Sequence, residues 1–165
     1  MKKLALIACS TAICLLPLTD IATAGGGKKF KTIEGAWEVQ AVARWETEDC
    51  TSGEVVPFGP NPFPILQTFN KGGTMNDYAA RTGPSERSTG FGTWEKSGKR
   101  TFTSHTMALG FDTNGLLSTN IDGRSDITLS DDGYSYSGIS RIKLVDLSGN
   151  AVTICLTLEG ARVPL

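Results

Sequence analysis

From residue 35 onward, apolar and polar residues alternate along the chain, and turn-forming residues interrupt the alternation at short intervals. A period of two places successive side chains on opposite faces, which is the pattern of a half-buried β-strand. No stretch of about twelve residues has the apolar spacing of an amphipathic helix. The pattern predicts eight strands, at residues 35–45, 65–70, 74–80, 89–96, 99–109, 116–130, 134–147 and 151–162.

Short breaks rich in glycine and asparagine separate most of these segments. They include Lys71-Gly72-Gly73 and Asn114-Gly115, and both residue types tolerate the positive φ that tight hairpin turns need. Strands joined in succession by hairpins form an up-and-down antiparallel sheet, and closing that sheet into a barrel removes its two exposed edges. We therefore predict an all-β fold, an eight-stranded up-and-down antiparallel barrel.

The expected loops alternate between short and long. In an up-and-down barrel every second loop lies at the same end. The loops at one end have only about two to four residues, whereas the other end carries the longer segments 46–64, 81–88 and 110–115. Long loops at one rim are typical of an open mouth, where binding residues usually lie. A β-sandwich would not require this alternation, although it is compatible with it.

The alternation also divides the side chains of each strand between two faces. In the first strand, Trp37 shares its face with several small residues, and we expect this face to point inward and to leave volume in the barrel. An eight-stranded barrel is just wide enough for a packed core or for one small ligand, so a filled interior is the alternative. The expected cavity lining is Val39, Ala41, Ala43, Trp45, Tyr136, Ser140, Ile142, Ile154, Leu156 and Leu158.

The N-terminal residues have the composition of a secretory signal peptide. Two lysines precede a largely apolar run over residues 4–18, and Ala22-Thr23-Ala24 fits a cleavage site. A membrane anchor is the alternative, but the run falls short of the roughly 20 apolar residues that span a bilayer. We expect export to the bacterial periplasm or the extracellular space, with a signal peptide over residues 1–24, a flexible leader over 25–34 and one domain over 35–165.

The charge balance does not favour a nucleic-acid partner. Sixteen lysines and arginines oppose seventeen acidic residues, which gives a formal net charge of −1 at pH 7. Nucleic-acid binding calls for a clustered basic face, and the sequence shows none. No second apolar segment is long enough to span a membrane after signal cleavage. The sequence does not indicate an oligomeric state.

Two of the four cysteines, Cys50 and Cys155, remain after signal removal. In an oxidising compartment, two cysteines imply one disulfide, and two buried free thiols are the alternative. Barrel closure favours the disulfide, because the start of the last strand would then lie beside the end of the first. The bridge would tie the long loop after the first strand to the rim beside the last strand.

Gly35-Ala36-Trp37 opens the first strand, and Arg162 closes the last. This combination, with the strand number and connectivity, resembles the calycin superfamily, which includes lipocalins, fatty-acid-binding proteins and bacterial lipocalin-like exported barrels. The resemblance implies that Trp37 and Arg162 pack across the closed end as structural anchors. The sequence departs from typical lipocalins because only three residues follow the last strand, which leaves no room for their C-terminal helix.

No catalytic motif is evident. His105 is the only histidine, and its strand could face either way. With one histidine and two bridged cysteines, we expect neither a metal site nor a cofactor. The loop residues Arg81, Glu86 and Arg87 are expected to form a solvated rim. Acidic residues are scattered over strands and turns, and the sequence does not show whether any two of them meet inside the barrel; they include Asp77, Asp112, Asp122, Asp126 and Glu159.

These observations lead to three functional hypotheses. The first is a protein that binds a small hydrophobic or partly polar molecule in the barrel. The second is a small-barrel cyclase or isomerase, which requires His105 or a carboxylate to point into the cavity. The third is a protein–protein interaction or inhibitor module whose rim loop exposes an apolar patch at Phe58 and Phe63. We favour the first.

Overall fold

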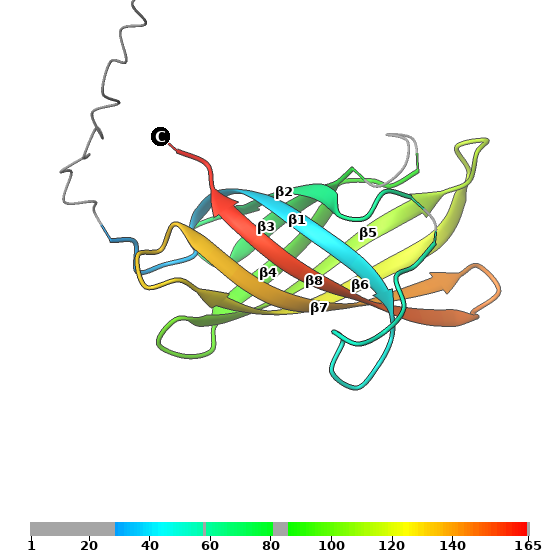
Figure 1. Ribbon diagram of the computed structural model, residues 1–165. Coiled ribbons are helices and arrows are strands. Elements are labelled where there is room, and N and C mark those ends of the chain that lie inside the picture. The colour runs from blue at the N-terminus through cyan, green and yellow to red at the C-terminus, as the bar shows by residue number, and fades with distance from the viewer. Residues whose placement is uncertain (1–28, 58, 81–85, 165) are drawn as a thin grey trace, which may run out of the picture.

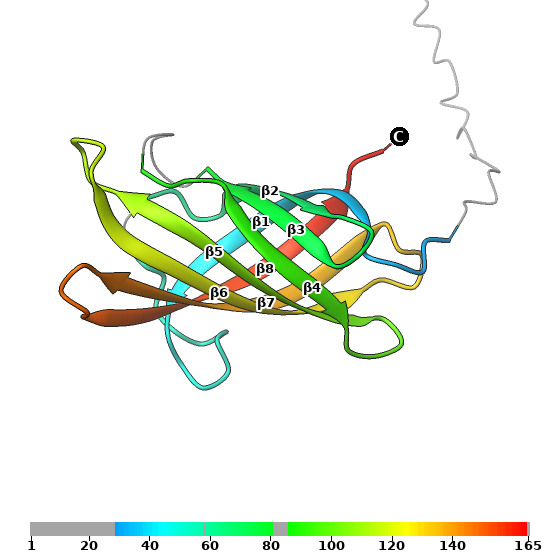
Figure 2. The same ribbon diagram turned by 180° about the vertical axis from the view of Figure 1, so that it is seen from behind.

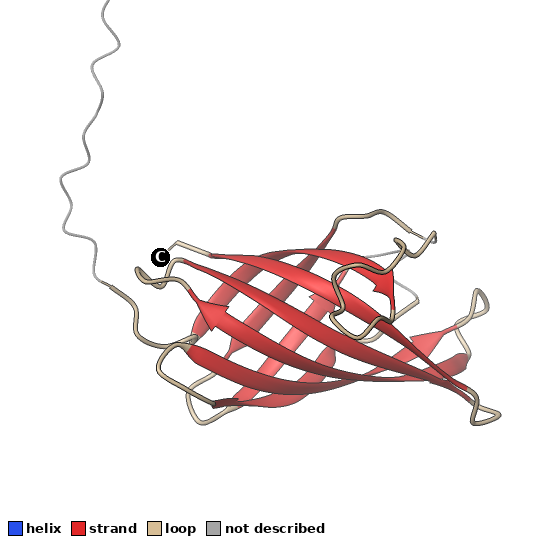
Figure 3. Cartoon of the chain, turned by 60° about the horizontal axis from the view of Figure 1, so that its bottom comes forward, coloured by secondary structure: helices blue, strands red, loops and turns tan. Residues whose placement is uncertain are grey.

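The computed structural model describes residues 29–57, 59–80 and 86–164. The expected signal peptide, the start of the expected leader and Phe58 lie outside the described residues. The structure is an all-β barrel closed by eight antiparallel strands (Figures 1 and 2), and strands and loops make up its whole described part (Figure 3). The described residues contain no helix long and apolar enough to cross a membrane.

The strands follow the chain order around the barrel, so each pairs with its neighbours in sequence. Their bounds are β1 Gly35–Trp45, β2 Phe63–Phe69, β3 Thr74–Ala79, β4 Gly90–Lys96, β5 Thr101–Phe111, β6 Leu117–Leu129, β7 Ser135–Asp146 and β8 Ala151–Arg162. The predicted fold class is therefore confirmed. The bounds differ most at β5, which is displaced by two residues to Thr101–Phe111, and at the start of β2, which begins at Phe63 rather than Ile65.

The earlier start of β2 shows how a strand accommodates a proline. Pro64 cannot donate to the ladder, which is why the expected strand began after it. Its carbonyl still accepts a hydrogen bond from Ala80 N at 2.9 Å, and Pro64 lies opposite Gln40 of β1. A proline near the end of a strand costs only one ladder hydrogen bond, so the pairing continues to Phe63.

Closure depends on the pairing of β1 with β8. The register runs from Trp37 opposite Arg162 to Trp45 opposite Ile154. This antiparallel pairing is the one that the sequence analysis required. With the sheet closed, one face of every strand points into the barrel and the other points to solvent. The burial pattern of β2, alternately buried and exposed along all seven residues, shows this division clearly.

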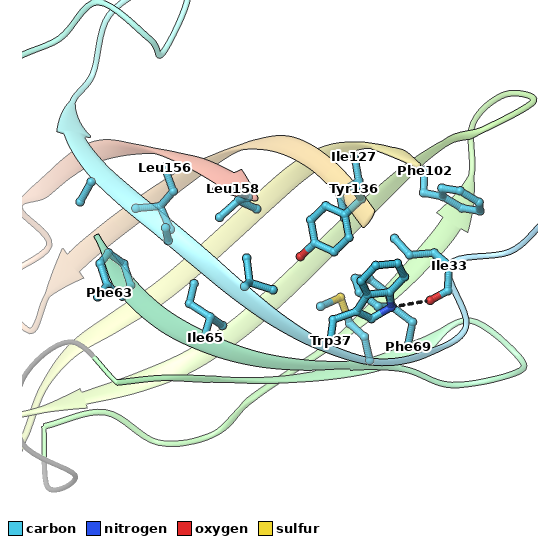
Figure 4. Packing of buried hydrophobic residues seen from close by; sticks show 14 of the residues in the cluster. Ile33, Trp37, Phe63, Ile65, Phe69, Phe102, Ile127, Tyr136, Leu156 and Leu158 are labelled. Carbon is cyan, nitrogen blue, oxygen red and sulfur yellow. Dashed lines mark hydrogen bonds between the residues drawn. The ribbon is translucent and has the colours of Figure 1, made fainter. Parts of the chain in front are cut away.

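The closed end of the barrel is tightly packed. Trp37 and Tyr136 meet edge-to-face with their ring centroids 4.9 Å apart, and the indole Nε1 donates to Ile33 O at 2.8 Å (Figure 4). Gly160 makes room for this arrangement, because a Cβ there would lie 2.3 Å from the Tyr136 ring. Further large side chains fill the same half of the barrel, namely Phe69, Met75, Phe102, Ile127 and Leu129.

Arg162 joins the leader to the barrel. Its guanidinium carbon lies 4.4 Å from the Trp37 ring centroid and 4.3 Å from that of Phe30. The same guanidinium donates to the carbonyl oxygens of Thr32, Glu34 and Gly133. The Trp37–Arg162 contact implied by the resemblance is thus present. Phe30 also contacts the guanidinium, which the sequence did not suggest.

The leader differs from the expectation of a flexible segment over residues 25–34. Phe30 N donates to Asp132 O at 3.0 Å, and the Phe30 ring meets Tyr134 edge-to-face. Ile33 is fully buried and belongs to the core. Residues 30–34 therefore form a strap that covers the closed end. The sequence pattern missed the strap because it has no strand periodicity and depends on contacts with the last strand.

Cys50 and Cys155 form a disulfide, with their Cα atoms 5.2 Å apart and a sequence separation of 105. Cys155 lies opposite Arg44 and Arg141 on the outer face of β8. The bridge therefore holds the β1–β2 loop against the outside of the barrel wall, where Arg141 donates to Glu48 O at 2.8 Å. In Figure 1 the β1–β2 loop lies outside the barrel, beside β7 and β8.

Replacement of Arg162 by methionine should destabilise the protein. The variant keeps an apolar stem but leaves three carbonyl groups and two aromatic faces without their cation. We expect the free energy of unfolding to fall by about 2–4 kcal/mol, given the usual strength of charge-assisted hydrogen bonds and cation–π contacts. Urea denaturation measures the change. Arg124→Met, at an exposed position, is the control; an equal loss in both variants would contradict the role of Arg162.

Removal of the disulfide should lower stability without opening the barrel. A crosslink over a loop of this length typically contributes about 2–5 kcal/mol. We expect that loss in Cys50→Ser/Cys155→Ser, measured by urea denaturation, together with retained β-sheet circular dichroism. Reductant should destabilise the native protein and leave the double variant unchanged. Equal sensitivity of both proteins to reductant would show that the bridge is absent.

Candidate functional site: a pocket at the open end of the barrel

The open half of the barrel contains a pocket of about 320 Å³. It lies at the end where β1–β2, β3–β4, β5–β6 and β7–β8 are connected, on the right in Figure 1. Its apolar wall comes from six strands and includes Phe63, Ile65, Ala79, Ile121, Ile142, Leu144, Ile154 and Leu156. Its polar lining consists of Asp77, Glu86, Arg87, Thr106, Ser118 and Thr119.

The expected cavity residues divide between the pocket and the packed core. Ile142, Ile154 and Leu156 line the pocket. Trp45 lies opposite Ile154 at the open rim and is partly exposed. The others are buried but do not line the pocket; they are Val39, Ala41, Ala43, Tyr136, Ser140 and Leu158. The barrel is thus filled in its closed half and hollow in its open half.

The small residues of β1 do not produce the hollow, contrary to the expectation from their size. Ala41 lies opposite Phe63 on one side and Leu158 on the other, and Ala43 lies opposite Leu156. Large neighbours occupy the volume that the alanines leave, as close-packed interiors require. The hollow lies across the barrel, where Gly110 and Gly123 line it. A Cβ at Gly123 would lie 2.8 Å from Ile142 Cδ1, so this glycine makes room for the Ile142 side chain.

One ion pair lies in the pocket wall. Arg87 Nη2 is 3.0 Å from both carboxylate oxygens of Asp77, and Arg87 Nη1 donates to Ser88 O at 3.0 Å. Both side chains are largely shielded from solvent, with 10% of Asp77 and 20% of Arg87 exposed. The expectation of a solvated rim is wrong for Arg87, which is largely shielded and paired with Asp77. Glu86 is partly exposed and lines the pocket, and Arg81 lies outside the described residues.

Gly90 allows this ion pair to form. It lies opposite Asp77 on β4, and a Cβ at this position would lie 1.7 Å from Asp77 Oδ1. The carboxylate therefore occupies the space above a strand residue that has no side chain. Met75, Asp77 and Ala79 alternate along β3 and point into the barrel. This alternation was the sequence signal for the inward orientation of Asp77. Nothing in the sequence marked Arg87 as its partner.

A second polar contact lies below the ion pair. Gln67 is paired with Asp77 across β2 and β3, and its amide oxygen accepts a hydrogen bond from the Tyr136 hydroxyl. Burial, with smaller contributions from the charges of Asp77 and Glu159, raises the pKa of Tyr136. The phenol therefore stays protonated at neutral pH and remains a donor to Gln67. These two residues separate the pocket from the aromatic core of the closed end.

The β1–β2 loop leaves the mouth uncovered over its first half. Cys50 holds this part to the outer wall, and Arg44 Nη1 donates to Gly53 O at 3.1 Å. The chain then returns along β1, where Val56 N donates to Ala43 O. Asn61 fixes the return by accepting from Ala43 N and donating to Val56 O. The disulfide thus draws a long loop away from the pocket.

His105 lies on the outside of the barrel. It is opposite Thr93 on β4 and Arg124 on β6, and its Nε2 is 3.1 Å from Asp122 Oδ1. The enzyme hypothesis required this histidine or a carboxylate in the cavity; only the carboxylates of Asp77 and Glu86 are there among the described residues. No three or more histidine, cysteine or acidic side chains of the described residues are grouped as metal ligands.

Two further hollows, of about 550 and 440 Å³, lie on the outer wall of the closed half. The first runs over β5 to β8 and is bordered by hydroxyl and charged side chains, including Asp126, Arg141 and Glu159. The second contains His105 and Arg124. The first also contains the outward side chain of Ile139, so the outer hollows are not uniformly polar. The inner pocket lies inside the barrel with apolar side chains from six strands around it, and it is therefore the better candidate for a small organic ligand.

The interaction hypothesis expected an apolar rim patch at Phe58 and Phe63. Phe63 is only 2% exposed and lines the inner pocket, so it contributes nothing to an outer patch. The expected strand began at Ile65, which placed Phe63 in the preceding loop. Its placement as the first residue of β2 turns its side chain inward.

Comparisons with known proteins found no match: no family model fits the sequence, and neither a curated protein nor a solved structure is similar to it.

The Asp77–Arg87 contact should show strong coupling in a double-mutant cycle. Asp77→Asn should leave a shielded guanidinium without its counter-charge, and Arg87→Met should do the same to the carboxylate. Because charged hydrogen-bond partners lost in shielded sites are costly, we expect a coupling energy of about 1–3 kcal/mol in urea denaturation. Arg100 and Asp131, an exposed pair, provide the control cycle, for which we expect less than about 1 kcal/mol. Equal coupling in the two cycles would contradict the shielded pair.

Proposed function

We propose that this protein is an exported, lipocalin-like carrier that binds a compact, largely apolar molecule in the pocket at the open end of the barrel. The observation that carries the proposal is the contrast between the two halves of the interior. Aromatic and aliphatic side chains fill the closed half, whereas an apolar wall from six strands surrounds about 320 Å³ in the open half. Protein interiors otherwise leave few voids larger than a water molecule.

The size of the pocket supports a compact ligand. Small-molecule sites typically measure about 300–1,000 Å³, so this pocket is near the lower limit. The Gln67–Tyr136 contact and the packed rings beyond it form its floor. A long acyl chain would need the space that these side chains fill. A molecule with one or two fused rings fits the available volume better.

Export is supported by two features of the chain. The N-terminal residues have the basic, apolar and small-residue regions of a signal peptide, and the domain contains a disulfide, which persists in oxidising compartments. The calycin resemblance agrees with both. The first strand begins with Gly-Ala-Trp and the last ends with the arginine that contacts that tryptophan.

A neutral aromatic probe tests the pocket directly. N-phenyl-1-naphthylamine should bind to the wild-type protein, as measured by isothermal titration calorimetry. Ile142→Trp should weaken binding at least tenfold because the larger ring occupies the pocket. Val145→Trp is the matched control: it makes a similar increase in size on the outer face of the same strand and should bind as the wild type does. Thermal unfolding checks that both variants are folded. No binding to the wild type, or equal binding by both variants, would refute the pocket.

A further inference from the structure

We propose that the pocket selects a cationic ligand, a compact apolar molecule with a protonated amine. This inference rests on the proposed function and concerns the charge of the ligand. It follows from which charged groups in the pocket already have partners, and from how charge is distributed between the two ends of the barrel.

Three charged side chains line the pocket: Asp77, Glu86 and Arg87. The Arg87 guanidinium is engaged by both carboxylate oxygens of Asp77 and by Ser88 O. The Glu86 carboxylate forms no ion pair or side-chain hydrogen bond with the described residues; only its backbone carbonyl is used, by Phe111 N. Among the described residues, the pocket lining thus has one carboxylate more than it has cations, and Glu86 is the one without an ionic partner.

The loops around the mouth have the same sign of charge. Residues 46–54 carry four carboxylates, but Cys50 holds this part of the β1–β2 loop against the outer wall. Among the other described loop residues at the mouth, which are 55–57, 59–62, 80, 86–89, 112–116 and 147–150, Glu86 and Asp112 are acidic and Arg87 is basic. A mouth of one sign with apolar walls attracts ligands of the opposite sign and raises their local concentration.

The opposite end of the barrel shows that this distribution is not uniform. Basic residues surround the closed end, at Lys29, Lys31, Lys71, Lys99 and Arg100. Acidic residues lie there too, at Glu34, Asp131 and Asp132, and Arg100 forms an ion pair with Asp131. Basic residues nevertheless outnumber acidic ones at the closed end, whereas acidic residues outnumber basic ones among the described loop residues of the mouth.

An anionic ligand would bind poorly to this arrangement. Its charge would lie close to Glu86, and the Asp77 carboxylate already compensates the charge of Arg87. An amine, by contrast, would meet Glu86 at the entrance while its apolar body contacts Ile142, Ile154 and Leu156. Pairing the amine with a carboxylate that has no ionic partner among the described residues is favourable.

Three probes with one ring system isolate the effect of charge: 1-naphthylmethylamine, 1-naphthalenemethanol and 1-naphthoic acid. Calorimetric titration at neutral pH and low salt should give the tightest binding for the amine, at least tenfold tighter than for the acid, with the alcohol between them. Because salt screens exposed charges, the difference should shrink at high ionic strength.

Glu86→Gln should reduce the affinity for the amine toward that for the alcohol and leave the alcohol unchanged. Glu38→Gln, at an exposed outward position of β1, is the matched control and should change neither. Equal losses in the two variants, or no loss in Glu86→Gln, would overturn the assignment of Glu86 as the cation partner. Thermal unfolding confirms that both variants are folded.

The outcomes separate this inference from the proposed function. If the alcohol binds, Ile142→Trp abolishes its binding, and the acid binds as tightly as the amine, then the pocket stands and the cationic preference is wrong. If none of the three probes nor N-phenyl-1-naphthylamine binds, the pocket itself has no ligand role and both conclusions fall.

Discussion

The pairing of β1 with β8 is the interaction on which the rest of the structure depends. An open eight-stranded sheet would leave two rows of unpaired backbone groups at its edges and would define no inside. Once the first and last strands pair, every alternating segment acquires an inner and an outer face. The Arg162 contacts with Trp37, Phe30 and three carbonyl oxygens are formed at one end of this seam. They join the two chain termini of the domain and cover the closed end.

The two ends of the barrel are packed in different ways. At the closed end, short turns bring the strands together, and the strap at residues 30–34 seals the aromatic core. At the open end, residues 46–54 of the β1–β2 loop lie on the outer wall and not over the mouth. The disulfide holds them there, because Cys155 faces outward and fixes this part of the loop to the wall. A crosslink that stabilises the fold therefore also keeps these residues away from the mouth.

The polar groups inside the barrel are placed where they can be satisfied. The Tyr136 hydroxyl donates to Gln67, and the Asp77 carboxylate is paired with Arg87. Buried polar groups without partners are costly, so such pairs fix the side chains that make them. They form a boundary between the packed and the hollow halves, and they leave Glu86 as the charged group of the pocket without an ionic partner among the described residues. The contacts among β2, β3 and the start of β4 thus determine both where the pocket ends and which of its charged side chains are paired.

The period-two alternation and the turn residues determined how many strands there are, approximately where each begins and ends, and which face of β1 points inward. Both signals are local along the chain, so they can be read without the tertiary structure. Chain order and closure were enough to place Trp37 beside Arg162 and Cys50 near Cys155. Only the tertiary structure decided which half of the barrel is hollow, since volume depends on neighbours such as Phe63 and Leu158 around Ala41. It also decided that Arg87 turns inward and that His105 faces solvent. A loop residue has no periodicity to reveal its direction, and a lone polar residue within a strand faces the side that register with the neighbouring strands imposes.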